Sequence, residues 1–164
     1  MFTTPFPGQS ALTWPAKSST PTAYDNYGYA IAVGKFKGGS YDAVAVGAPG
    51  DAGDGAAYVF TRAGAEWREQ QKIKTEAKMP DAMFGSAVAL SKDTLLVGSS
   101  DDSTEIMDAG SAYVYTRNAG TWALEQRLVP APISSGASFG YAVALRGDEA
   151  IIGASVRIRC VRDR

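Results

Sequence analysis

Histidine is absent from this 164-residue sequence, and cysteine occurs once, as Cys160. A single thiol cannot form a disulfide within the chain, and a zinc site of the usual cysteine and histidine kind lacks its ligands. Without histidine, the sequence offers neither a Ser-His-Asp triad nor the commonest general base of enzymes. The composition therefore argues against catalysis and against a metal held by such ligands.

A long apolar segment is also missing. Residues 1–22 contain four large apolar side chains, but three prolines, Pro5, Pro7 and Pro15, interrupt them. This pattern predicts neither a signal peptide nor a membrane span. We expect residues 1–22 to be an N-terminal extension that is poorly ordered or adds a stray outer strand.

Positive charge is scarce outside the C-terminal end. The net charge is −1, but residues 156–164 hold four arginines against one aspartate, so the rest of the chain is mildly acidic. An acidic body argues against a nucleic-acid partner. We interpret residues 156–164 as an atypical basic tail, most simply a solvated terminus.

What the sequence does contain is an internal repeat. Three segments begin almost identically, at Tyr27, Phe84 and Phe139, and their starts lie 57 and 55 residues apart. Further similar blocks follow in matched order: 44–49, 95–100 and 151–155, then 55–62 and 110–117, then 67–73 and 122–128. Repeats of this length are typical of solenoids, propellers and arrays.

Each block predicts a β-strand, because it is short, rich in β-branched and aromatic residues and bounded by turn residues. In the first strand, large apolar residues alternate with alanines, so both faces are apolar and one is small. This pattern suits a sheet packed closely between neighbours. The fourth strand carries polar residues on one face, which predicts a solvent-exposed outer edge. Those residues are Arg68, Gln70, Lys72, Glu125 and Arg127.

Four strands per repeat, graded from apolar to polar, predict an all-β fold and a partial β-propeller of four-stranded antiparallel blades. A β-sandwich or a solenoid remains open on these patterns alone. We expect the first blade at 23–78, the second at 79–133 and half of a third at 134–155. Since propellers close with four to eight blades, we also expect a truncated or fragmentary chain that self-associates.

The motifs Phe-Gly-x-Ala-Val-Ala-Leu, Val-Gly-Ala-Pro and Gly-x-Ala-Tyr-Val-Tyr resemble the FG-GAP repeats of integrin α-subunit propellers, in a bacterial-type variant. The resemblance covers residues 27–155. It implies a non-catalytic binding or adhesion module for a protein or glycan ligand, at the cell surface or outside the cell. The alternatives are a propeller fragment of an extracellular hydrolase or lyase, and a structural remnant without activity.

The resemblance also implies Ca²⁺ in the loop after the first strand, but Lys35 and Lys37 stand where acidic ligands would fall. We therefore expect no calcium in that loop. Acidic residues gather instead between the second and third strands, and they are weak candidates for a cation site, although solvated turns explain them as well. They are Asp51, Asp54, Asp101, Asp102, Glu105 and Asp108. We expect no acid/base chemistry from the adjacent Asp101 and Asp102.

Two further patterns have simpler explanations than function. Arg146, Gly147 and Asp148 spell a tripeptide that integrins recognise, yet Ser91, Lys92 and Asp93 occupy the same turn in the preceding repeat. Aromatic rows in the third strands invite a sugar-stacking hypothesis, but aromatics at strand spacing are more often core between blades. The rows comprise Tyr58, Phe60, Tyr113 and Tyr115.

Overall fold

The computed structural model describes residues 24–36, 43–64, 66–76, 79–132 and 134–155. This part of the chain forms ten β-strands and one short 3₁₀ turn, η1, at Asp51–Gly53. The strands of the first sheet are β1 (Ala30–Gly34), β2 (Ala43–Ala48), β3 (Ala56–Ala63) and β4 (Glu66–Ile73). The second sheet contains β5 (Phe84–Ser91), β6 (Thr94–Ser99), β7 (Ser111–Asn118) and β8 (Thr121–Leu128). The third contains β9 (Phe139–Arg146) and β10 (Glu149–Ala154).

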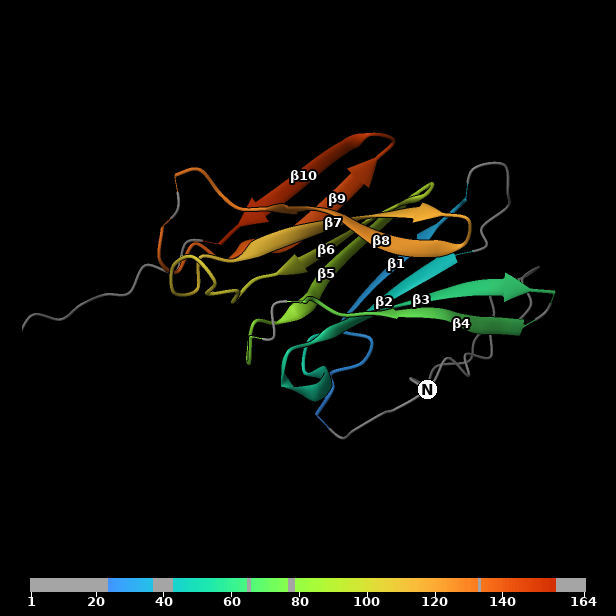
Figure 1. The fold of residues 1–164 in the computed structure, drawn as a ribbon, viewed down its shortest axis with the longest axis horizontal. Coiled ribbons are helices and arrows are strands. Elements are labelled where there is room, and N and C mark those ends of the chain that lie inside the picture. The colour runs from blue at the N-terminus through green and yellow to red at the C-terminus, as the bar shows by residue number, and fades with distance from the viewer. Residues whose placement is uncertain (1–23, 37–42, 65, 77–78, 133, 156–164) are drawn as a thin grey trace, which may run out of the picture.

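Every sheet is antiparallel and its strands follow sequence order, β1-β2-β3-β4, β5-β6-β7-β8 and β9-β10. The three sheets lie face to face, with β5–β8 in the middle (Figure 1). The all-β fold and the partial propeller predicted from the repeats are therefore confirmed. The predicted segments 1–22 and 156–164 lie outside the described residues.

The sheets meet through faces of opposite character. Strand β5 lies on β1 and β2, and β9 lies on β5 and β6, so the first strand of one sheet covers the first two strands of the preceding one. Small residues of the first sheet, such as Ala32 and Ala45, pack against large residues of the second, such as Val88 and Val97. Alanines allow the sheets to approach closely, which the alternation in the first strand predicted.

Two glycine pairs make this approach possible. A Cβ on Gly47 would lie 2.0 Å from the carbonyl oxygen of Gly85, and a Cβ on Gly98 would lie 2.0 Å from that of Gly140. Gly85 and Gly140 adopt φ of +92° and +88°, a region that favours glycine. The recurring glycines of the sequence thus set the spacing between the sheets.

The expectation that each first strand is covered on both faces holds for β5 and fails for β1 and β9, the first strands of the two end sheets. Residues Val88 and Leu90 of β5 are each 8% exposed, whereas Ile31 and Val33 of β1 are 62% and 64% exposed. The reason is positional, because no described sheet precedes β1.

The two ends of the sheets differ. At one end, here called the hairpin rim, described two-residue turns join strands at 92–93, 119–120 and 147–148. At the other end, here called the loop rim, longer segments at 49–55, 74–83, 100–110 and 129–138 connect the strands. Apart from η1, the described residues contain no helix, and none of their segments is a helix long and apolar enough to cross a membrane.

Candidate functional site

The loop rim of the first sheet is built on a buried carboxylate. Asp51 is 2% exposed and forms ion pairs with Lys72 of β4 at 2.8 Å and with Lys74 at 3.1 Å. The hydroxyl of Tyr58 on β3 donates a further hydrogen bond to Asp51. The Lys72 ammonium also lies 5.1 Å from the centre of the Tyr58 ring. These contacts fix the loop between β2 and β3 to strands β3 and β4.

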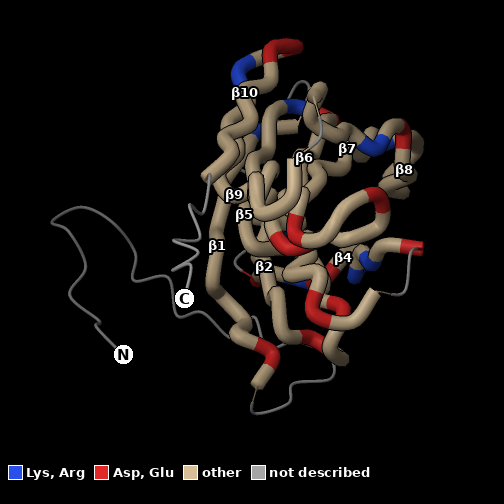
Figure 2. Tube along the Cα trace, turned by 90° about the vertical axis from the view of Figure 1, so that its left-hand side faces the viewer, with Lys and Arg blue, Asp and Glu red and all other residues tan. Residues whose placement is uncertain are grey.

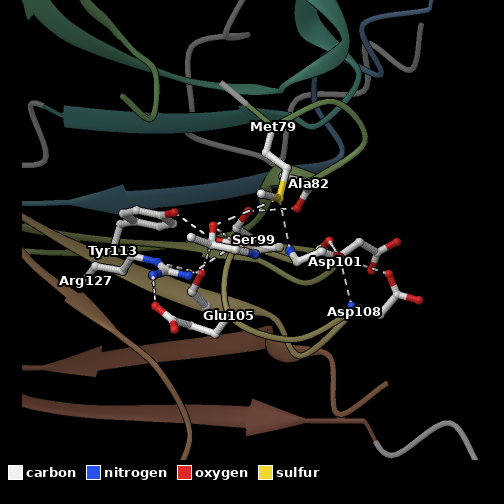
Figure 3. Close-up of polar contacts among 12 residues, drawn as sticks. Met79, Ala82, Ser99, Asp101, Glu105, Asp108, Tyr113 and Arg127 are labelled. Atoms are coloured by element: carbon white, nitrogen blue, oxygen red, sulfur yellow. Dashed lines mark hydrogen bonds and ion pairs between the residues drawn. The ribbon is translucent and has the colours of Figure 1, made fainter. Parts of the chain in front are cut away.

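The second sheet repeats this arrangement around Asp102, which is also 2% exposed. Figure 3 shows Tyr113, Arg127 and Glu105 of this network. Its Oδ2 accepts hydrogen bonds from Ser111 and from the Tyr113 hydroxyl, the latter at 2.7 Å. Its Oδ1 lies 3.2 Å from Nη2 of Arg127 on β8. The Thr104 amide, 2.9 Å away, donates to the same oxygen and closes the loop onto the carboxylate.

Both carboxylates are held in the charged form. Burial alone would raise the pKa of Asp51, but hydrogen bonds from Lys72 and Tyr58 outweigh it and hold the pKa below its ordinary value. Burial likewise opposes the charge of Asp102, and hydrogen bonds led by that of Ser111 lower its pKa. The same pairing raises the pKa of Lys72 and of Arg127 against the effect of burial.

This geometry corrects the interpretation of the fourth strands as purely solvent-facing edges. Lys72 and Arg127 are only 24% exposed, because each reaches back to a buried aspartate. It also bears on the metal candidates. The oxygens of Asp51 and Asp102 point at cations and hydroxyl groups, so they do not form a donor set that fits Ca²⁺. Nowhere in the described segments do three acidic side chains converge as a metal site would require.

The remaining candidates are dispersed along the loops. Asp101 accepts a hydrogen bond from Ser100 at 3.0 Å, and Ser103 donates one to Asp108 at 3.4 Å. Asp54 lies half-buried after η1. Glu105 pairs with Arg127 at 3.3 Å. Lys35 is exposed after β1, and Lys37 lies outside the described residues, so the expected lack of calcium in that loop stays a prediction.

Main-chain hydrogen bonds join the loops of the rim into one surface. The Asp81 amide donates to Gly53 at 2.8 Å and links the first loop to the connector between the sheets. The Ser138 amide donates to Asp108 at 3.1 Å and links the second loop to the next connector. Figure 2 looks onto this rim and shows acidic residues along its loops. Loops held this way on a rigid sheet scaffold are suited to binding.

The longest of these loops carries an exposed apolar pair at its tip. Ile106 and Met107 are 40% and 64% exposed, and they stand between Glu105 and Asp108. The sequence interpretation attended to the acidic residues and missed this pair. The available signal was an apolar dipeptide within a polar loop, which burial in a core does not explain.

A cleft of about 470 Å³ lies between the outer strands of the first two sheets. It is lined by residues of β4 and β8 and the segment after β4, including Lys74, Glu76 and Leu124. Two aromatic rings lie at its wall, but Tyr115 is 4% and Trp122 is 3% exposed. Neither ring offers a free face for stacking against a sugar.

The aromatic rows of β3 and β7 are buried, but only the row of β7 lies between two described sheets, as the sequence predicted for both. Tyr113 and Tyr115 belong to the core between the first two sheets, whereas Tyr58 and Phe60 form a separate buried cluster on the opposite face of the first sheet. Gly147 and Asp148 form the β9–β10 turn directly after Arg146, and Asp148 pairs with Lys92 of the neighbouring turn at 3.7 Å.

The repeat family can be identified at this point. A model of the FG-GAP repeat matches residues 67–115 and 122–159, together more than half of the chain, so the chain belongs to the FG-GAP repeat family. Repeats of this family form β-propeller-type modules that are generally involved in binding and are generally not catalytic. A comparison with curated proteins found no match.

The matched segments are out of phase with the sheets. The first match begins at Trp67 in β4 and ends at Tyr115 in β7, so it takes the outer strand of one sheet and three strands of the next. The second match begins at Trp122 in β8 and runs through β9 and β10. Each family repeat therefore joins two neighbouring sheets.

Proposed function

We propose that this chain is a non-catalytic adhesion module that acts at the cell surface or outside the cell and binds a protein through its loop rim. The observation that carries the proposal is the tip of loop 100–110. Its exposed Ile106 and Met107 lie on a loop that the buried Asp102 network fixes in place. An apolar contact on a pre-ordered support costs little conformational entropy on binding.

The surrounding charge supports a partner of opposite charge. Apart from Lys74, which pairs with Asp51, and Lys78, which lies outside the described residues, the charged residues of the rim segments are acidic. The more exposed ones are Asp54, Glu76, Asp81, Asp101, Glu105 and Asp108. A partner surface that combines basic and apolar residues would complement this rim. The buried state of the aromatic rings in the cleft favours a protein over a glycan.

The test maps binding of defined probes to the ¹⁵N-labelled chain by NMR. One peptide alternates lysine and leucine, a second alternates glutamate and leucine, and the third probe is a neutral hexasaccharide. We expect the lysine peptide to shift amide signals of loop 100–110 and its neighbours on the loop rim. Serine substitutions at Ile106 and Met107 should weaken its affinity at least about tenfold.

Leu124→Ser is the matched control, because Leu124 is 43% exposed but lies on β8 away from the loop tip. This variant should bind the lysine peptide like the wild type. The proposal is wrong if the shifts fall on the hairpin rim, if the glutamate peptide binds equally well, or if only the hexasaccharide binds.

A further inference from the structure

Two sheet faces of opposite character lie uncovered at the two ends of the stack. On β1 and the residue before it, Tyr29, Ile31 and Val33 are 59%, 62% and 64% exposed. On the third sheet, Ile151 is 73% exposed and the alanines of β9 beside it are exposed as well. Exposed apolar residues that share one strand face form a surface that a partner is expected to cover.

These faces correspond to the two sides of a contact that the chain already makes twice. In both cases the large face of a first strand covers the small face of the first two strands of the preceding sheet, β5 on β1–β2 and β9 on β5–β6. Within the described residues, the large face of β1 has no preceding sheet to cover. The small face of β9 and β10 has no following sheet to cover it.

The close-approach glycines show the same pattern. Gly85 and Gly140 each bring a carbonyl oxygen against a glycine of the preceding sheet. Gly28, two residues before β1, has the same backbone conformation, with φ of +92°. A Cβ on Gly28 would meet no atom within 4 Å. Gly153 occupies the place of Gly47 and Gly98, and its nearest neighbours belong to Ala142 in its own sheet.

We propose that two copies of this chain associate head to tail, with β1 of one copy covering β9 and β10 of the other. In this contact the Gly28 carbonyl of one copy approaches Gly153 of the other, and Ile31 packs beside Ile151. The contact joins two different faces, so a dimer of two copies still has one free β1 face and one free β9–β10 face. Such heterologous contacts extend into longer assemblies or close into rings.

One position departs from the two internal contacts. Arg146 stands where the preceding sheets have Gly34 and Ser91. The inner contact is tight there, since a Cβ on Gly34 would lie 2.8 Å from Leu90. Arg146 must therefore turn its side chain toward solvent when a second copy docks. We expect Arg146→Ser to tighten association about two- to tenfold, the cost of ordering one long side chain.

The decisive experiment combines two single variants, Ile31→Lys and Ile151→Lys, in sedimentation velocity over a range of concentrations. Both side chains are exposed, so each variant should keep the fold, which circular dichroism checks. We expect the wild type to associate with increasing concentration and each variant alone to lose at least about tenfold in affinity. An equimolar mixture still contains one unmodified pair of faces, so it should form dimers and nothing larger.

Three results would overturn the proposal. The first is a wild-type chain that keeps the mass of one copy, 17.2 kDa, up to about 1 mM. The second is association of wild-type strength by either variant alone. A two-fold symmetric dimer would use the same face of both copies, so a substitution on the other face would leave it intact. The third is a mixture that fails to restore dimers although each variant is folded.

Gly153→Ala provides an independent check on the same contact. Its Cβ would lie 3.5 Å from Ala142, an ordinary distance, so the isolated chain should tolerate it. In the proposed assembly the new methyl group would collide with the Gly28 carbonyl of the other copy. We expect at least about tenfold weaker association without a change in the circular dichroism spectrum. Wild-type association by this variant would exclude the glycine pairing.

Discussion

The side-chain amide of Gln71 binds both main-chain groups of Trp122. Its Nε2 donates to the Trp122 carbonyl at 2.9 Å, and its Oε1 accepts from the Trp122 amide at 2.9 Å. The contact joins β4 to β8, the outer strands of two neighbouring sheets. Packing of alanines joins the sheets near β1 and β5, so this glutamine holds the opposite side of the same interface.

Gln71→Ala should lower the free energy of unfolding by about 1–3 kcal/mol, since it leaves two partly buried main-chain groups without their partner. The matched control is Gln126→Ala. Gln126 occupies the same place in β8, is exposed, and faces no third outer strand within the described residues. Its loss should change stability by less than about 0.5 kcal/mol. Urea denaturation of both variants measures the difference, and equal effects would contradict the structural role of Gln71.

Asp102→Asn should destabilise the chain by about 2–4 kcal/mol, because it removes the counter-charge of Arg127 and weakens the hydrogen bonds from Ser111 and Tyr113. Asp101→Asn is the control next to it in sequence. Asp101 is less buried and forms no ion pair with a cation in the described segments, so its effect should stay below about 0.5 kcal/mol. Thermal and urea unfolding provide the measurement. A mild Asp102 variant would mean that packing, not charge, holds loop 100–110.

Stability should depend on acid pH through Asp51 and Asp102. Their pKa values in the folded chain are lowered, so the unfolded chain, with an aspartate pKa of about 3.9, takes up protons first as the pH falls. Their contribution is therefore complete above that value and is lost as the pH falls through the folded pKa.

The measurement is the free energy of unfolding between about pH 6 and pH 2. The double variant with Asn at positions 51 and 102 should show a flatter decline than the wild type. Identical slopes in the two proteins would exclude the two buried carboxylates as the source.

Gly98→Ala and Gly153→Ala substitute the same position in two successive sheets and should differ sharply. The methyl group at position 98 would lie 2.0 Å from the Gly140 carbonyl, which forces the sheets apart. We expect a loss of at least about 3 kcal/mol, or failure to fold. At position 153 the change should be within about 0.5 kcal/mol. Expression level and thermal unfolding of the two variants give the comparison.

The sequence was sufficient to predict the repeated sheets, because the glycines, alanines and aromatic residues recur with their spacing. It also favoured a core role for Tyr113 and Tyr115, which the structure confirms. It did not predict that Lys72 and Arg127 reach buried aspartates. Alternation assigns a strand residue to a face, but a long flexible side chain ends several ångströms from its Cα, where only tertiary structure determines its partner.

The candidate site was harder to predict for a related reason. Asp51 and Asp54 look equivalent in sequence, yet one is buried among cations and the other is half-exposed. Turn residues such as these have the same composition whether they serve solvation, ion pairing or metal binding. Ile106 and Met107 were missed because two apolar residues in a loop form no periodic pattern.

The mismatch in phase between family repeats and sheets has a consequence for how the chain melts. The match that starts at Trp67 spans β4, which completes the first sheet, and β5 to β7, which form most of the second. A division of the chain at the start of this match would therefore remove the outer strand β4 from the first sheet and leave it attached to the second. Buried clusters also cross from the first sheet to the second and from the second to the third, so the loss of structure in neighbouring sheets is coupled, and heating should produce one cooperative transition instead of a sequence of independent ones.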